Sequence, residues 1–365
     1  MTHTDKVIFE SLKKWRLDKA KNKGWPAYTI FHNSHLQNIV NAKPKTLDEL
    51  LTVNGVGPKK IKEYGNEIIS MFNCQDDIIT TNKKNRDINY NFFKNVYEAS
   101  IERCNPTYQF NRNQWITTDR GTAILNTESE CDIYTKYYGA RHNIVLSQQS
   151  QILLDSYENY FCDNLIINDF GAGQGFGTFT FIEEMIKKDI KCNRLTINLI
   201  EPSDAALEKA KNYIEELIQY GSPKPCNKYK INKINLMLDE MDQDLSSINS
   251  KRMNYGEDTT INIFSNILDV DSVDIDELIE SLNCINNDYN FFICNSPVIN
   301  NYSRMNKLND FYTYFQNNYN FTCIQNNKNH HVTGKAYYFS GSYDPDLRDI
   351  QYRYKGFIFK TENEG

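Results

Sequence analysis

The sequence predicts a small all-helical module at the N-terminus, followed by an α/β domain with a doubly wound sheet. Apolar residues recur at helical spacing through residues 5–73. After Asp163, short apolar runs alternate with amphipathic segments, which is typical of parallel strands joined by right-handed crossovers. The first of these runs leads into a glycine-rich turn at 171–177, where a doubly wound sheet begins its ligand site. A chain of 365 residues has room for two such units.

The helical module opens with an amphipathic segment in which Leu12 and Trp15 share one side. A second helical pair follows in the segment PAYTIFHNSHLQNIVNAKP. Thr46, with Glu49 three positions later, has the pattern of a capping box at the start of another helix. The turn NGVGPKK then leads into the last helix of the module.

Composition changes divide the rest of the chain. Residues around 76–90 are polar and make the best linker candidate. We therefore expect a helical domain at 1–75, a linker at 76–90, a helical lead-in at 91–160 and the α/β domain at 161–365.

The α/β domain is predicted from alternating strand and helix patterns. The expected strands are 165–170, 194–202, 230–237, 259–270 and 289–297, and the expected helices are 178–188, 204–220 and 275–285. Two further runs, 335–342 and 351–360, are rich in Tyr and Phe, which suits edge or antiparallel strands.

Charge is unevenly distributed along the chain. The net charge is −6, but residues 1–75 carry 12 Lys/Arg and 7 Asp/Glu, a local excess of +5. A basic module on an acidic body indicates that contact with phosphate groups, if made, starts at the N-terminus.

Cysteine and histidine usage argues against disulfides and metal sites. The nine cysteines lie at irregular spacings without a Cys-x-x-Cys pair, which predicts reduced thiols in a cytoplasmic protein. His330 and His331 form the only adjacent histidine pair, and no histidine has ligand spacing to a cysteine, so no metal site is expected.

There is no apolar run of about 20 residues, the length that a membrane span needs, and the first residues lack the apolar stretch of a secretory signal.

The glycine-rich turn NDFGAGQGFG can be compared with three ligand classes. A nucleoside-triphosphate loop needs Gly-Lys-Ser/Thr after its glycines, and no lysine is present here. A dinucleotide site has an acidic residue near the end of the second strand, and Glu201 suits either kind of adenosine ribose there. Asp169 discriminates between the ligands, because a carboxylate beside the loop repels a pyrophosphate but suits the cationic amino group and sulfonium of S-adenosylmethionine.

The pattern Asp-x-Gly-x-Gly-x-Gly, followed by an acidic strand end, resembles class I S-adenosylmethionine-dependent methyltransferases over residues 160–300. The resemblance implies a Rossmann-like fold and this cofactor. It places Glu201 at the ribose, Asp239 or Asp242 at the adenine amine, and Ser265 with Asn266 beside the methyl group. The other implied cofactor contacts are Asp169, Gly171, Ala172, Gly173, Gly175 and Phe264.

The methyl acceptor is not evident from the sequence. The Asn/Asp-Pro-Pro-Tyr/Phe motif of amino-methylating DNA enzymes and the nucleophilic cysteine of cytosine C5 enzymes are both missing, and Cys294 is interpreted as a buried thiol. His142, in the segment YTKYYGARH, is a candidate general base, and Ser265 and Asn266 are further catalytic candidates.

The basic front end resembles the HRDC (helicase and RNase D C-terminal) domain over most of residues 6–73, through PAYTIFHNSHL, the Pro-x-Thr-x-x-Glu-Leu run and VNGVGPKKIKEYG. Gly55 and Gly57 open a turn before a helix, where free N–H groups suit a phosphate, and Lys59 and Lys60 follow. The resemblance implies weak, salt-sensitive binding of DNA or RNA, or docking to a helicase or another protein partner.

The sequence thus favours an S-adenosylmethionine-dependent methyltransferase that acts on nucleic acid or on a nucleic-acid-associated protein, in the cytoplasm and without a membrane contact. The alternative is a non-catalytic sensor or scaffold that binds the same cofactor and is tethered to a helicase or DNA complex. A nicotinamide-dependent dehydrogenase is disfavoured by Asp169.

Overall fold

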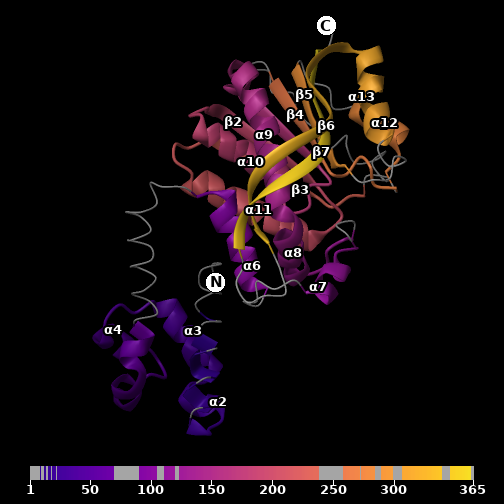
Figure 1. Ribbon diagram of the computed structural model, residues 1–365. Helices are drawn as coiled ribbons and strands as arrows, with labels where there is room; N and C mark the ends of the chain where they lie inside the picture. The colour runs from indigo at the N-terminus through magenta and orange to yellow at the C-terminus, as the bar shows by residue number, and fades with distance from the viewer. Residues whose placement is uncertain are drawn as a thin grey trace. The chain divides into compact units, whose positions relative to one another are not determined.

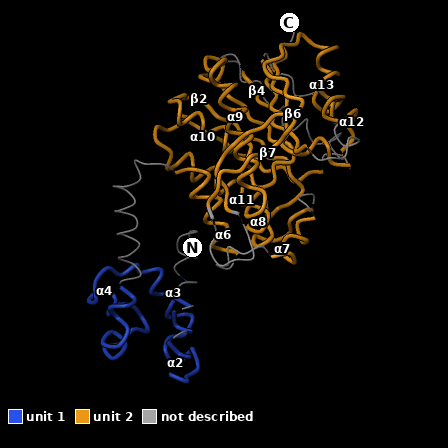
Figure 2. Tube along the Cα trace, viewed as in Figure 1, with its two compact units in different colours: residues 1–88 blue, residues 89–365 orange. Residues whose placement is uncertain are grey.

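The chain forms two compact units, residues 1–88 and residues 89–365 (Figure 2). The computed structural model describes residues 9, 12–13, 15–17, 19–21, 23–69, 90–104, 111–119, 123–237, 258–271, 273–283, 289–298, 306–338 and 346–362. The predicted linker at 76–90 lies, apart from Tyr90, outside these residues.

The first unit is helical throughout its described part, as predicted. Residues 9, 12–13, 15–17, 19–21 and 23 are helical and belong to its first helix, which is followed by α2 (Ala27–Ile30), α3 (Asn33–Ala42), α4 (Leu47–Leu51) and a helix at 58–69. They enclose a small apolar core that includes Leu36, Ile39, Leu50 and Ile68. The predicted capping box is formed in part: Thr46 accepts from the Glu49 N–H at 3.2 Å, whereas the Glu49 carboxylate accepts from Lys45 N instead of Thr46 N.

The second unit begins with a helical lead-in that packs against its α/β body (Figure 1). The lead-in comprises the π-helix η1 (Phe92–Glu98), α6 (Ala99–Arg103), α7 (Arg112–Thr117), α8 (Glu128–Tyr134), the π-helix η3 (Thr135–Gly139), α9 (Ala140–Tyr157) and the short helix η4 (Glu158–Phe161). The helices of the body are α10 (Phe176–Lys187), α11 (Asp204–Tyr220), α12 (Ile275–Asn283) and α13 (Asn306–Asn318).

A seven-stranded mixed sheet forms the centre of this unit, in the order β3-β2-β1-β4-β5-β7-β6. The strands are β1 (Asn164–Phe170), β2 (Cys192–Ile200), β3 (Cys226–Ile234), β4 (Asp258–Ser265), β5 (Tyr289–Pro297), β6 (Asn320–Tyr338) and β7 (Asp346–Glu362). Strands β1 to β5 pair in parallel, and β7 is antiparallel to both β5 and β6. The predicted doubly wound sheet with antiparallel closing strands is confirmed.

Helices cover both faces of the sheet. On one face, α10 contacts both α9 and α11, and all three helices pack on the strands, while α13 packs on the opposite face with α12 beside it. Strand residues alternate between the two cores, so that Ile167 belongs to the first and Phe170 to the second. Asp169 shares the face of Ile167 and therefore points toward α10.

A buried ladder of asparagines joins the first four strands of the sheet. The Nδ2 of Asn232 donates to Asn198 Oδ1 at 2.7 Å, Asn198 donates to Asn168 at 2.8 Å, and Asn168 donates to Asn262 at 2.9 Å. These residues are also direct register partners in β3, β2, β1 and β4. A shift of register would leave buried amides without partners, so the ladder specifies how the carboxyl ends of these strands align.

We expect Asn168→Ala to destabilise the second unit by about 2–4 kcal/mol, because it leaves the amides of Asn198 and Asn262 without their partner and opens a void. Urea unfolding of the full chain measures this change. Asn227→Ala is the matched control: Asn227 bonds Asn193 at 3.3 Å in an exposed pair, and its loss is expected to cost less than about 0.5 kcal/mol. Equal effects of the two substitutions would contradict the structural role of the ladder.

Candidate functional site

The glycine loop connects β1 to α10 at the carboxyl edge of the sheet. Gly171, Gly173 and Gly175 have φ values of +62°, +52° and +71°, a region that other residues rarely adopt. Ala172 N donates to Ile200 O at 3.0 Å, which ties the loop to the end of β2. The loop therefore has a fixed shape set by its glycines and by the neighbouring strand.

The three loop glycines differ in their surroundings. A Cβ on Gly171 would lie 2.6 Å from the side chain of Ile267, and one on Gly175 would lie 2.9 Å from Ala210. Close packing therefore requires glycine at both positions. A Cβ on Gly173 would meet no described atom within 4 Å. Gly173 is thus the loop position whose Cα faces open space, where a ligand could approach the backbone closely.

Asp169 lies beneath this loop with its side chain buried. Its Oδ2 accepts hydrogen bonds from Thr178 N at 2.9 Å and Thr178 Oγ1 at 2.8 Å, in the first turn of α10. Burial raises the pKa of Asp169 from 3.8 to about 7, the nearby Glu201 acts in the same direction, and the bonds from Thr178 oppose the rise. A cationic group placed here would favour the ionised carboxylate.

The raised pKa of Asp169 makes folding stability depend on pH. The folded chain keeps a proton that the unfolded chain loses near pH 3.8, so this contribution is full below that pH and is lost as pH rises to about 7. We expect the free energy of unfolding of the wild type, relative to Asp169→Asn, to fall between pH 5 and pH 8. Urea unfolding of both proteins at the two pH values measures it. A difference that stays constant or rises would contradict this pKa.

Glu201 follows β2 and is the second carboxylate at the loop. Its Oε2 accepts from Gly173 N at 3.0 Å and its Oε1 from Ser203 N at 3.1 Å, so it bridges the glycine loop and the start of α11. Desolvation raises its pKa, and these two hydrogen bonds oppose the rise. Each carboxylate oxygen retains a further lone pair that could accept from a ligand hydroxyl.

A chain of polar side chains links the carboxyl ends of β4 and β5 to α9. Ser265 Oγ donates to Asn295 Oδ1 at 3.1 Å, Asn266 Nδ2 donates to Ser265 Oγ at 3.1 Å, and Asn295 Nδ2 donates to Gln149 at 2.9 Å. Asn266 has φ +60°, a strained conformation that is often found at functional sites. Phe264 is fully buried and stacks on Phe170 at 4.6 Å, so its side chain belongs to the core.

Asp239 and Asp242, the expected adenine contacts, lie outside the described residues. Ala172 is 7% exposed and lies in the loop between two glycines with positive φ. The structure thus places Asp169, Ala172, Glu201 and the loop glycines together, with Ser265 and Asn266 following the neighbouring strand β4.

His142 lies within a set of four rings that we call the aromatic cluster: Tyr134, Tyr138, His142 and Phe176. The Tyr134 ring is 5.0 Å from that of Tyr138 and 5.8 Å from that of His142, and the His142 ring is 6.3 Å from Phe176. Phe176 is the first residue of α10, directly after the glycine loop. Desolvation lowers the pKa of His142 to about 4, so its imidazole is neutral at pH 7 and is a weak base.

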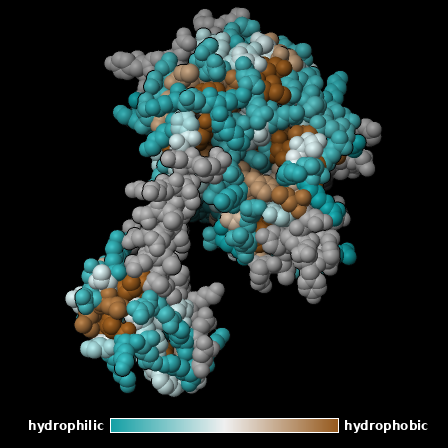
Figure 3. Space-filling view, turned by 60° about the vertical axis from the view of Figure 1, so that its left-hand side comes forward, coloured by the Kyte–Doolittle hydropathy of each residue, from teal (hydrophilic) through white to brown (hydrophobic). Residues whose placement is uncertain are grey.

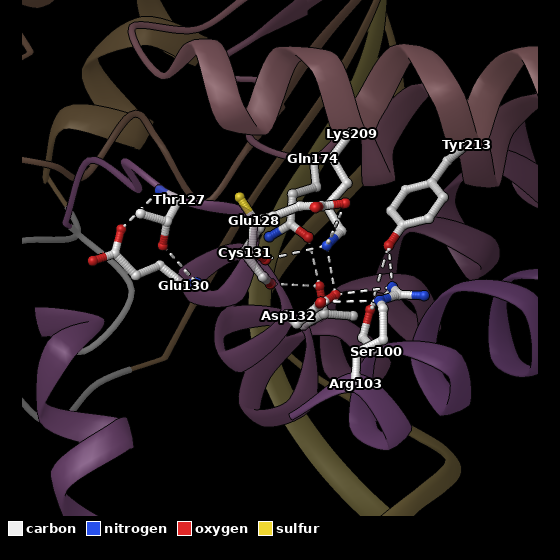
Figure 4. Close-up of polar contacts among 11 residues, drawn as sticks. Ser100, Arg103, Thr127, Glu128, Glu130, Cys131, Asp132, Gln174, Lys209 and Tyr213 are labelled. Atoms are coloured by element: carbon white, nitrogen blue, oxygen red, sulfur yellow. Dashed lines mark hydrogen bonds and ion pairs between the residues drawn. The ribbon is translucent and has the colours of Figure 1, made fainter. Parts of the chain in front are cut away.

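A buried ionic network holds α8, and with it the start of the aromatic cluster, against the α/β body (Figure 4). Arg103 forms two hydrogen bonds to Asp132, both at 2.9 Å, and donates to Tyr213 Oη at 2.8 Å. Lys209 on α11 lies 2.6 Å from the same carboxylate. A complete capping box of Thr127 and Glu130 starts α8.

We expect Asp132→Asn to lower the free energy of unfolding by about 3 kcal/mol, because it removes the carboxylate 2.6 Å from the buried Lys209 ammonium and leaves that ammonium only the exposed Glu128 carboxylate at 4.0 Å. Asp349→Asn is the control: Asp349 pairs with Lys335 at 2.9 Å, both side chains are more than half exposed, and its loss costs less than about 1 kcal/mol. Chemical denaturation of the full chain measures both changes, and comparable losses would refute the assigned role of the network.

In the first unit, the predicted phosphate-binding residues have different environments. Gly55 has φ +93° and packs against His35, where a Cβ would lie 2.2 Å from the ring, whereas Gly57 has open space around its Cα. Lys59 is exposed, but the Lys60 ammonium lies 4.3 Å from the Phe31 ring centroid, and its pKa is lowered by desolvation. Pro58 has no N–H, and Lys60 N donates to Gly57 O at 2.9 Å. The turn therefore offers fewer free N–H groups than the sequence suggested.

Exposed hydrophobic side chains also mark the surface of the first unit (Figure 3). Trp25 is 52% and Tyr28 60% exposed, and the Lys23 ammonium lies 4.9 Å from the Trp25 ring. These two rings were not predicted from the sequence. The pattern that could have indicated them is an aromatic pair that follows Lys23 where the first helix ends.

Comparisons with known proteins agree with the helical character of the first unit. Residues 5–71 match the family model of the HRDC domain. The ATP-dependent DNA helicase UvrD2 of Mycobacterium tuberculosis is 31% identical over 67 residues, which is 18% of this chain and 10% of that protein. The ATP-dependent DNA helicase RecQ of Pasteurella multocida is 29% identical over 76 residues, 21% of this chain and 12% of that protein. The match thus spans about a tenth of the length of these relatives and shows an N-terminal HRDC domain.

Solved structures are similar to each unit. HRDC domain 3 of RecQ from D. radiodurans is 33% identical, with a TM-score of 0.20, covering 21% of this chain and 99% of that one. The plantazolicin methyltransferase BpumL in complex with SAH is 12% identical, with a TM-score of 0.36, covering 73% and 100%. A precorrin-6y C5,15-methyltransferase from Geobacter metallireducens is 10% identical, with a TM-score of 0.33, covering 58% and 86%.

The described residues show neither a membrane-spanning helix nor a metal-binding cluster. Among the helices in that part of the chain, none is both long and apolar enough to cross a membrane. Within the same residues, no three His, Cys, Asp or Glu side chains come together in a way that could hold a metal ion.

Proposed function

We propose that the second unit binds S-adenosylmethionine at the glycine loop and transfers its methyl group to an acceptor that the HRDC domain helps to bring near. The observation that carries this proposal is the open Cα of Gly173, with Asp169 and Glu201 on either side of the loop. Two carboxylates suit a ligand that has a cationic end and a pair of ribose hydroxyls.

The donor set fits this cofactor better than a dinucleotide. A pyrophosphate needs free N–H groups at the start of α10, but Thr178 N already donates to Asp169 and Gly173 N to Glu201. Asp169 would attract the amino group and the sulfonium, Glu201 would accept from the ribose hydroxyls, and Gly173 would let the ligand approach the backbone. When bound, the cofactor supplies an electrophilic methyl group.

This chain's own contribution to catalysis is mainly orientation. The polar chain of Ser265, Asn266 and Asn295 lies at the carboxyl ends of β4 and β5 and offers amide and hydroxyl groups to an acceptor. Because its pKa is about 4, the His142 imidazole is too weak a base for us to assign it proton removal from the acceptor. We assign it instead a role in orienting the acceptor by ring contact.

We expect Gly173→Ala to weaken S-adenosylmethionine binding at least about tenfold, because a methyl group fills the open space above the loop, while folding stability falls by only about 1–2 kcal/mol from the positive φ. Gly24→Ala is the matched control, since Gly24 has φ +64° and an equally open Cα in the first unit. Isothermal titration calorimetry of the full chain compares them. Unchanged affinity in Gly173→Ala would remove the loop as the cofactor site.

Methyl transfer separates an enzyme from a sensor or scaffold that only binds the cofactor. Radiolabelled S-adenosylmethionine is incubated with cell extract and the full chain, and the products are treated separately with nuclease and with protease. Label that is lost with one treatment and is absent for Gly173→Ala identifies the acceptor class. Binding without label transfer would favour the sensor or scaffold function.

The HRDC domain is proposed to bind the backbone of a single-stranded nucleic acid through its exposed lysines. We expect Lys59→Ala to weaken binding of a short single-stranded DNA and to reduce the slope of log K against log salt by about 1, as for loss of one phosphate contact. Lys60→Ala is expected to change the slope less, because that ammonium already lies over Phe31. Fluorescence anisotropy at several salt concentrations measures both slopes. Slopes of both variants that equal the slope of the wild type would favour docking of a protein by this domain.

A further inference from the structure

The aromatic cluster contains a buried polar atom that lacks a partner. Tyr138 Oη makes no hydrogen bond in the described part of the chain. A buried hydroxyl without a partner is costly, and such an atom in a folded protein calls for an explanation, which a bound ligand would provide.

The backbone that carries the cluster is unusual. Tyr134, Tyr138 and His142 follow one another at intervals of four residues, and the π-helix η3 joins α8 to α9 between them. A π-helix widens the helical turn and is found frequently at functional sites. Gly139 within it has Phe176 at 3.6 Å from its ideal Cβ position, so the segment lies directly against the start of α10.

The four rings of the cluster are uncharged at pH 7, although the Arg141 guanidinium acts on one of them. His142 is unprotonated because desolvation, and after it the charge of Arg141, lowers its pKa to about 4. An uncharged planar ring matches the stacking faces of these rings and the unpartnered Tyr138 hydroxyl.

The cluster extends from the start of α11 to β7. Tyr134 packs with Ala206 of α11, and Glu201 acts on the pKa of Tyr134. Helix α9, which carries His142, contacts β5, β6 and β7, and the cluster lies near Tyr352 of β7. Because Phe176 directly follows the glycine loop, a ring bound at the cluster lies beside that loop.

We propose that the aromatic cluster binds an unstacked, uncharged nucleobase of a single-stranded nucleic acid by ring stacking and by hydrogen bonds to Tyr138 and His142. This proposal rests on the proposed function, in which that base is the part of the acceptor presented to the cofactor. Single-stranded nucleic acids are commonly held by base stacking on aromatic side chains, and enzymes that modify bases take them out of the stack.

The test is photo-crosslinking of the full chain to a single-stranded oligonucleotide that contains 5-iodouracil, with the linked peptides identified by mass spectrometry. Peptide mapping separates links to the cluster, within residues 134–142 or at Phe176, from links to the HRDC domain at Trp25 or Tyr28. Tyr138→Phe keeps the ring and removes the unpartnered hydroxyl, and we expect it to lower the yield at the cluster at least about fivefold. Tyr229→Phe, on the exposed β3 edge, is the matched control and should leave the yield unchanged.

The affinity of each variant for S-adenosylmethionine is measured in parallel by calorimetry. Crosslinks at the cluster that fall in Tyr138→Phe, with cofactor affinity unchanged, support the proposal. Links confined to the HRDC domain, or methyl label found only on protein, overturn it. An equal fall in cofactor affinity in Tyr138→Phe also overturns it, because the cluster would then hold the cofactor. Failure of the wild type to bind S-adenosylmethionine defeats the proposed function, while the crosslinks still decide whether the cluster binds a base.

Discussion

The hydrogen-bonded row of Asn232, Asn198, Asn168 and Asn262 is the constraint on which the candidate site depends. Because each amide is the register partner of the next, the four strands can align in only one way without leaving buried polar groups unpaired. That alignment brings the ends of β2, β1 and β4 to one edge, where Glu201, Asp169 and Ser265 follow one another across the sheet.

Two opposing effects meet at this edge. Burial raises the pKa values of Asp169 and Glu201, while hydrogen bonds from Thr178, Gly173 and Ser203 favour the charged forms. A ligand with positive charge relieves the cost of ionising Asp169, whereas a pyrophosphate would increase it. The same N–H groups that hold the carboxylates are those that a pyrophosphate would need, and for this reason we propose a ligand with a cationic end at the loop.

Much of the fold was predictable because its signals are local. The strand at 289–297 and the helix at 204–220 have the predicted bounds, since both have strong apolar patterns and clear ends. Strand β6 begins 15 residues before the predicted start at residue 335, and α13 was not predicted, because Asn- and His-rich segments lack regular apolar alternation. The predicted strand 259–270 ends at Ser265, where Asn266 adopts its positive φ. The sequence alone does not indicate a role for its many asparagines, because only the strand register places four of them side by side.

The site residues were found from their order along the chain, but their partners depend on tertiary contacts that no local pattern shows. Three such features are the hydrogen bonds from Thr178 to Asp169, the contact of the Lys60 ammonium with the Phe31 ring, and the buried Tyr138 hydroxyl without a partner.

The most direct test of the central claim is hydrogen–deuterium exchange of the full chain with S-adenosylmethionine and, separately, with a nicotinamide dinucleotide. The account predicts slower exchange in peptides covering residues 171–178 and 201–203 with S-adenosylmethionine alone. Unchanged exchange there, or protection by the dinucleotide instead, would contradict it.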